Sequence, residues 1–177
     1  MVNIIFNRLQ TRKKLKNNVN ALEQLVTHEY EKMYRIALSY THHHDDALDL
    51  IQTSFNKALL SLQKNSDIQN IQGWYYRILI NTCKDAWRKK QHEPTSIDIS
   101  VEKVTQSNAT ITRLELNEVI AKLDSPEKEI ILLKFFEGFT LEETAIILDM
   151  NVNTVKTKMY RALNRLRQIL ENKEGTL

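Results

Sequence analysis

Glycine, proline and cysteine are scarce in this chain of 177 residues, which holds 3 Gly, 2 Pro and 1 Cys. So few Gly and Pro leave little material for the tight turns of β-hairpins, which disfavours a β-rich fold. The single cysteine, Cys83, excludes an intramolecular disulfide and a zinc site built from cysteines. No apolar run reaches the roughly 18 residues of a transmembrane helix, so we expect no direct insertion into a membrane.

Patterns that carry catalysis are missing as well. The sequence has no glycine-rich phosphate loop and no recognisable nucleophile–base pair. At the N-terminus a short apolar patch, Val2 to Phe6, precedes the cations, whereas in a secretory signal it would follow them. We therefore expect a cytoplasmic binding protein without catalytic residues, cofactor, metal or small-molecule substrate.

The residues that are abundant, Leu, Ile, Lys, Glu, Gln and Asn, favour an all-α fold. The net charge of +3 is unevenly distributed along the chain. Residues 1–20 hold five cations and no acid, residues 74–90 five cations and one acid, and residues 113–150 nine carboxylates and four cations; the chain after residue 150 is basic again. Such blocks predict several separate contacts with polyanions, and acidic faces that remain for protein partners.

Apolar residues recur at helical spacing along most of the chain. After a basic segment (residues 1–18), predicted as a frayed helix, a long helix begins at Val19 and has Tyr30 on its apolar stripe. A second helix follows His42–His44 with Asp45 as its N-cap, and a third opens at Gly73. Residues 93–112 have no periodicity and read as a flexible linker. The sequence thus predicts two small helical domains, at residues 19–92 and 113–172.

The second predicted domain ends in two helices joined by a tight turn. A helix capped by Ser125, with Pro126 at its first position, precedes them and ends at Gly138. Thr140 and Glu143 form a capping box for the first helix of the pair, and Asn151 is a good N-cap for the second. The predicted buried residues of the first helix are Leu141, Ala145, Ile146 and Leu148. This pattern is typical of a helix-turn-helix.

The last helix exposes mostly cations, hydroxyls, amides and one tyrosine, whereas its partner exposes carboxylates that phosphates would repel. A cationic helix with hydrogen-bonding side chains in its N-terminal half suits reading of the DNA major groove. The alternative is an ordinary helical hairpin with a solvated basic face.

The stretch from Trp74 to Lys90 interleaves aromatic and basic side chains, as single-stranded nucleic-acid surfaces do. An aromatic ring that stacks on an unpaired base contributes about 1–3 kcal/mol. The alternative is that the aromatics are core and the charges a solvated face. Because Trp74, Tyr75 and Tyr76 are adjacent, they cannot all point outward. We place Trp87 on the buried stripe.

An acidic helix follows the three histidines, with the sequence DDALDLIQ from Asp45 to Gln52. Asp45 and Asp49 share one face of it, and Gln52 lies beside them. The face could be solvated, bind a metal or dock a protein. Three consecutive histidines do not converge easily on one ion, and no other ligands cluster nearby, so a metal site is disfavoured.

Three segments in this order, YRIALSYTHHHDDALDLIQTSFNKAL, GWYYRILINTCKDAWRKK and the closing helix-turn-helix, resemble bacterial RNA polymerase sigma factors of the extracytoplasmic-function (ECF) group. The resemblance spans about Val19 to Leu170 apart from the linker. It implies a sigma-two domain (residues 19–92), a linker and a sigma-four domain (residues 113–172). It also implies a promoter-specificity subunit that directs transcription initiation.

The resemblance assigns roles by position. Asp45, Asp49 and Gln52 match the surface that docks on the β′ clamp helices. Asn81 matches the position lining the pocket for a flipped minus-10 base, and Trp74, Arg77 and Lys84 lie on the melting surface beside it. Positions facing the minus-35 element are Lys156, Thr157, Tyr160 and Arg161, and Lys134 is assigned as a phosphate contact.

The implied partners are core RNA polymerase, through its β′ clamp helices and β flap, duplex and single-stranded promoter DNA, and an anti-sigma factor that could hold the protein at the membrane. The chain departs from the family pattern at Thr53, at His42–His44 and at Asn153, and the basic segment 1–18 has no clear family counterpart. Two other classes stay open: a free-standing helix-turn-helix regulator that acts without being a polymerase subunit, and a helical adaptor that does not bind DNA.

Overall fold

The computed structural model describes residues 2–65, 67–92, 119–120 and 122–174. The chain divides into two compact units, Met1–Ile99 (unit 1) and Ser100–Leu177 (unit 2). The described residues form helices and turns without any strand, which confirms the all-α prediction. No helix among them is both long and apolar enough to span a membrane. The predicted linker, residues 93–112, lies outside the described residues.

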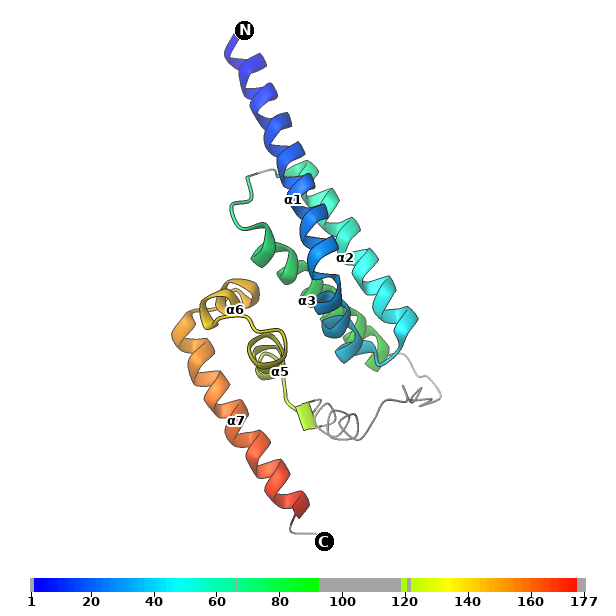
Figure 1. Ribbon diagram of the computed structural model, residues 1–177, viewed down its shortest axis with the longest axis vertical. Helices are drawn as coiled ribbons and strands as arrows, with labels where there is room; N and C mark the ends of the chain where they lie inside the picture. Colours follow the sequence, from blue (N-terminus) through cyan, green and yellow to red (C-terminus); the bar gives the residue numbers. More distant parts are fainter. Residues whose placement is uncertain (1, 66, 93–118, 121, 175–177) are drawn as a thin grey trace. The chain divides into compact units, whose positions relative to one another are not determined.

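Unit 1 consists of three long helices that pack side by side: α1 (Val2–Thr41), α2 (His44–Lys64) and α3 (Ile71–His92). The chain runs down α1, back along α2 and down again along α3 (Figure 1). Each helix contributes one face to the core, as its apolar spacing predicts. The core includes Leu22, Met33, Ile36, Ala37, Tyr40, Ala47, Leu50, Ile51, Ala58, Leu62, Tyr75, Tyr76, Leu79, Ile80 and Cys83. Tyr30, predicted on the apolar stripe, is instead 40% exposed.

Helix α1 is longer than the sequence predicts, because the basic segment continues directly into the helix that follows it. Its N-terminal turns extend beyond the ends of α2 and α3 (Figure 1). The helix is interrupted at Glu29, whose backbone angles (φ −110°, ψ 16°) are not helical. The carboxylate of Glu29 accepts hydrogen bonds from Gln72 Nε2 (2.8 Å) and from the hydroxyl of Tyr76 (2.7 Å). A single side chain at the kink therefore joins α1 to the first turns of α3.

Unit 2 contains α5 (Glu127–Ile131), the π-helix η1 (Leu132–Phe136), α6 (Leu141–Leu148) and α7 (Val152–Glu174). Two apolar clusters hold it together, and α7 contributes to both. One joins α7 to Ile131, Leu132 and the preceding residues Val119, Ile120 and Leu123. The other joins it to Ile130 and Ala145. The predicted cap at Ser125 is wrong by one residue, since Pro126 occupies the N-cap and α5 begins at Glu127.

Helices α6 and α7 form the predicted helix-turn-helix. The capping box is confirmed: Thr140 Oγ1 accepts the Glu143 N–H (3.1 Å), and the Glu143 carboxylate accepts the Thr140 N–H (2.7 Å). Asp149 ends α6 in the left-handed conformation (φ 57°), which Asp tolerates better than most residues. Asn151 Oδ1 accepts the Asn153 N–H at 2.8 Å and so caps α7, as predicted.

The predicted buried face of α6 needs one correction. Ile146 is 44% exposed, whereas Thr144 and Ile147 are buried. Residues 141, 144, 145 and 148 follow one side of the helix, and Ile146 lies on the opposite side. Residues 145–148 are all apolar, and because consecutive residues of a helix point in different directions, one of them faces solvent.

Replacing Thr140 by alanine should fray the first turn of α6, because the Glu143 N–H would lose its acceptor. Loss of such a cap costs about 1 kcal/mol, so amide exchange at Glu143 should accelerate about fivefold. Hydrogen-exchange mass spectrometry on the full chain measures this. Thr154→Ala, at an exposed position of α7, is the matched control and should leave α6 unchanged. Equal protection of α6 in both variants would contradict the role of the cap.

Candidate functional site

The predicted docking residues of α2 lie together on its exposed side. Asp45, Asp49 and Gln52 are all exposed, and their spacing of four and three residues puts them on one stripe. The opposite side of the helix carries the buried residues Ala47, Leu50, Ile51, Ser54 and Ala58. No cluster of three or more metal-ligating side chains occurs in the described part of the chain. Helix α2 thus presents two carboxylates and an amide to solvent, while its opposite face packs in the core.

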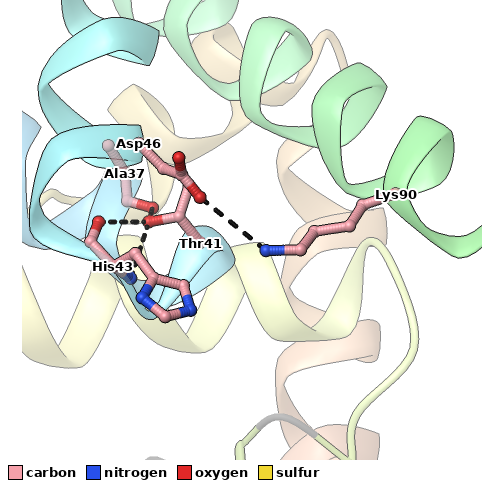
Figure 2. A network of polar contacts seen from close by, with 5 residues as sticks. All are labelled: Ala37, Thr41, His43, Asp46 and Lys90. Carbon is pink, nitrogen blue, oxygen red and sulfur yellow. Dashed lines mark hydrogen bonds and ion pairs between the residues drawn. The ribbon is translucent and has the colours of Figure 1, made fainter. Parts of the chain in front are cut away.

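The start of α2 is built differently from the sequence prediction. His43, rather than Asp45, is the N-cap, and its side chain makes no capping hydrogen bond. The hydroxyl of Thr41 lies close to the His43 carbonyl oxygen (3.0 Å) and accepts the His43 N–H (3.4 Å), as Figure 2 shows. Asp45 is therefore the second residue of the helix, in its first turn, where its carboxylate is favoured by the helix dipole while it stays exposed.

Two further contacts attach this end of α2 to its neighbours. Asp46 lies 3.7 Å from Lys90 near the end of α3 (Figure 2). The hydroxyl of Tyr34 on α1 lies 2.8 Å from His44 Nδ1, and the two rings meet edge to face. Of the three histidines, His44 thus contributes to packing between α1 and α2.

The aromatic residues of α3 divide between core and surface. Tyr75 and Tyr76 are fully buried, Trp74 is half-buried and Trp87 is 45% exposed. The Tyr75 hydroxyl lies 3.0 Å from Ser54 Oγ on α2, and burial raises the pKa of this phenol. The prediction that part of the aromatic cluster is core holds for the two tyrosines. The placement of Trp87 on the buried stripe is wrong, because Cys83 is the last buried residue in the described part of α3 and the core does not extend to Trp87.

The four predicted melting residues form one stripe along α3. Trp74, Arg77, Asn81 and Lys84 follow each other at intervals of three, four and three residues, which is the spacing of one helix face. Asn81 is exposed and the other three are half-buried. Tyr75, Tyr76, Leu79 and Cys83 occupy the opposite face in the core. The stripe offers an aromatic ring, an amide and two cations to a ligand that lies along the helix.

The predicted minus-35 residues lie on the outer face of α7. Lys156, Thr157, Tyr160 and Arg161 are all exposed, and Tyr160 by 63%. Val155, Met159, Ala162 and Leu166 are buried on the other side. Thr157 donates its hydroxyl hydrogen to the Asn153 carbonyl (2.9 Å), so this side chain is oriented by its own helix. Lys134 stands apart from the other four, half-buried in η1.

Two carboxylates that local patterns did not indicate lie against the cations of α7. Glu127 is nearly buried, and its Oε1 lies 3.4 Å from Arg161 Nε. Asp124 accepts a hydrogen bond from Arg165 at 2.6 Å, which raises the pKa of that guanidinium. These carboxylates precede their partners by more than thirty residues, beyond the reach of any helical periodicity. The two carboxylates thus connect Arg161 and Arg165 of α7 to the residues at the start of α5.

Comparison with known proteins matches two regions of the chain. Residues 25–93 match the family model described as Sigma-70 region 2, and residues 113–166 match Sigma-70, region 4. The chain is 36% identical to RNA polymerase sigma factor SigV of Bacillus subtilis over 156 residues, which cover 88% of this chain and 94% of that protein. It is 30% identical over 138 residues to the ECF RNA polymerase sigma factor EcfG of Rhodopseudomonas palustris, with 76% of each chain covered.

Among solved structures, the fold is similar to that of the sigma factor RpoE of Bartonella quintana, crystallised with the anti-sigma factor NepR. The TM-score is 0.63 at 24% identity, and the match covers 84% of this chain and 96% of that one.

Proposed function

Because the chain belongs to the sigma-70 family, as an RNA polymerase sigma factor of the ECF group, we propose that its three exposed stripes divide the work of promoter recognition. In this proposal α2 docks on core polymerase, α3 captures the melted minus-10 element and α7 reads the minus-35 duplex. The observation that carries the proposal is that the residues assigned by position to one task, Lys134 apart, share one face of one helix outside the core. The chain's region 2 match argues against a free-standing helix-turn-helix regulator.

The docking stripe consists of Asp45, Asp49 and Gln52, and its proposed partner is the pair of clamp helices of the β′ subunit. Two exposed carboxylates and an amide suit a basic and hydrogen-bonding surface. The buried face of α2 holds the stripe in place, and the Asp46–Lys90 contact ties its start to α3. Docking and DNA capture would therefore use two helices of one rigid core.

The capture stripe consists of Trp74, Arg77, Asn81 and Lys84, and its proposed ligand is unpaired DNA. The cations can follow the phosphates, and the half-buried Trp74 ring can stack on or wedge beside a base. The exposed amide of Asn81 has both a donor and an acceptor for the edge of a flipped base.

The reading face consists of Lys156, Thr157, Tyr160 and Arg161 on α7, the second helix of the helix-turn-helix. Such a helix places its N-terminal residues against base edges in the major groove. Lys134 in η1 is proposed as a phosphate contact, which positions the unit without reading sequence. The β flap of the polymerase is the proposed protein partner of unit 2.

An anti-sigma factor is a further proposed partner, because the similar sigma factor RpoE was crystallised with one. We propose that the protein works in the cytoplasm and that such a partner could hold it at the membrane until it is released.

Two alanine variants separate docking from DNA capture in assays with purified core polymerase. Asp49→Ala should lower core affinity about tenfold, equivalent to roughly 1.4 kcal/mol. Asn81→Ala should keep core affinity but reduce open-complex formation, measured by permanganate reactivity of unpaired thymines. Glu142→Ala and Asn20→Ala, both at exposed positions, are the matched controls. If Asp49→Ala bound core as the wild type does, or Asn81→Ala opened promoters normally, that assignment would be wrong.

A further inference from the structure

The N-terminal end of α1 is not explained by the three stripes. The region 2 match begins at residue 25, whereas α1 begins at Val2. Residues 1–20 contain Arg8, Arg12, Lys13, Lys14 and Lys16 and no acidic residue. At a rise of about 1.5 Å per residue, the turns before Val19 add roughly 25 Å of helix. A long cationic helix thus projects from the bundle that contains the region 2 match.

Most of the described side chains of this projection face solvent, and Leu15 and Asn18 are half-buried. Gln10, Thr11, Arg12, Lys13 and Lys14 are exposed, as are Lys16 and Asn17. We call residues 10–18 the basic arm. Within the described part of the chain, Arg12, Lys13 and Lys16 have no ion-pair partner. On a helix these three residues lie within about 100° of one another, so their charges share one side.

The fourth cation of the arm makes an exposed contact with the rest of unit 1. Lys14 Nζ lies 3.0 Å from Asp67 Oδ1, in the loop between α2 and α3. That loop leads into Ile71, where α3 begins, and the capture stripe starts one turn later at Trp74. The basic arm therefore leaves unit 1 at the end where the capture stripe starts (Figure 1). Its unpaired cations continue the positive charge of Arg77 and Lys84 beyond the bundle.

We propose that the basic arm binds the phosphate backbone of the double-stranded DNA that adjoins the melted minus-10 segment. This inference rests on the proposed role of the α3 stripe for its location. Lysines and an arginine on an exposed helix neutralise phosphates and release counterions. Contacts to phosphates position a protein on DNA but carry no sequence information, so the proposed contact is independent of sequence. It adds affinity to promoter binding without altering which promoter is chosen.

The salt dependence of promoter binding tests the arm directly. The variant Arg12→Gln/Lys13→Gln/Lys16→Gln removes its three unpaired charges and keeps hydrogen-bonding side chains. In complex with core polymerase, its slope of log Kobs against log [KCl] should be shallower by about 2 to 3, because each phosphate contact contributes about 0.9. The loss should be the same on promoters with different minus-35 and minus-10 sequences. The control Arg35→Gln/Lys122→Gln/Arg167→Gln removes equal charge at exposed positions outside the arm and should keep the wild-type slope.

Each other outcome has a defined meaning. An unchanged slope in the arm variant, with wild-type transcription still promoter-specific, overturns the arm and leaves the proposed function intact. Wild-type protein without promoter-specific transcription overturns the proposed function instead. Loss of core affinity at unchanged slope would make the arm a polymerase contact. Arm-dependent sedimentation with vesicles of phosphatidylglycerol and phosphatidylcholine, at unchanged slope, would make it a membrane contact. Either result overturns DNA binding by the arm.

Discussion

Replacing Arg161 by alanine should abolish most of the discrimination between promoters that differ in their minus-35 element. An arginine that makes a bidentate contact to a base contributes about 1–3 kcal/mol of discrimination, which corresponds to roughly 5- to 150-fold in affinity. The side chain is 78% exposed, so a ligand can reach it, and Glu127 holds it from one side at 3.4 Å. Run-off transcription with core polymerase, on matched promoters with intact and altered minus-35 elements, measures the ratio directly.

The matched control is Arg167→Ala on the same helix. Arg167 is also exposed, and it pairs with Glu171 one turn further along α7, about two turns C-terminal to Tyr160. It should keep the wild-type ratio between promoters. Removal of Arg161 leaves the nearly buried Glu127 without this partner, which could also lower the stability of unit 2. The thermal unfolding of each variant is therefore measured, so that a loss of promoter discrimination can be told from a loss of stability. A wild-type ratio in a folded Arg161→Ala protein would show that α7 reads the duplex through other residues.

Replacing Tyr76 by alanine should be the most destabilising single change in unit 1 that we consider. The ring is fully buried and its hydroxyl donates to Glu29 at 2.7 Å. Truncation of a large buried aromatic side chain costs about 3–5 kcal/mol. Tyr76→Phe keeps the ring and loses only the hydrogen bond to a carboxylate, which should cost about 1.5–3 kcal/mol. The two variants therefore separate packing from the polar contact at the kink.

Tryptophan fluorescence during urea unfolding can report this effect for unit 1 alone. The chain has two tryptophans, Trp74 and Trp87, and both lie on α3. Tyr160→Ala, which removes a tyrosine that is 63% exposed in unit 2, should leave the fluorescence transition where it is in the wild type. If Tyr76→Ala unfolded at the same urea concentration as the wild type, the packing of α3 on α1 described above would be wrong.

Much of the fold and of the site was predictable because burial follows helical spacing. The stripes of α2, α3 and α7 could be placed from the sequence, since residues three and four apart share a face. The division of the aromatic cluster also had a signal. Tyr75 and Tyr76 precede the buried Leu79 by four and three residues, whereas Trp74 precedes it by five and falls on another side.

Contacts between distant parts of the chain carried no local signal. The pairs Glu127–Arg161, Asp46–Lys90 and Glu29–Tyr76 join different helices. Their formation depends on how the helices pack, which no short pattern contains. The N-cap of α2 was mispredicted for a related reason: Asp45 has the right side chain for a cap, but the hydroxyl of Thr41 already accepts the N–H of the residue before the helix.

The two hydrogen bonds to Glu29 bear on how far the N-terminal end of α1 lies from the residues of α3. One carboxylate accepts two hydrogen bonds from α3 at the only interruption that the described part of α1 contains. These hydrogen bonds hold the bend against α3, and the Lys14–Asp67 contact between exposed side chains adds a second connection at the projecting end. These contacts predict a constant offset between the basic arm and Asn81 within unit 1. On DNA, the edge of the protected duplex should stand at a constant number of base pairs from the flipped base, whatever the spacing between the two promoter elements.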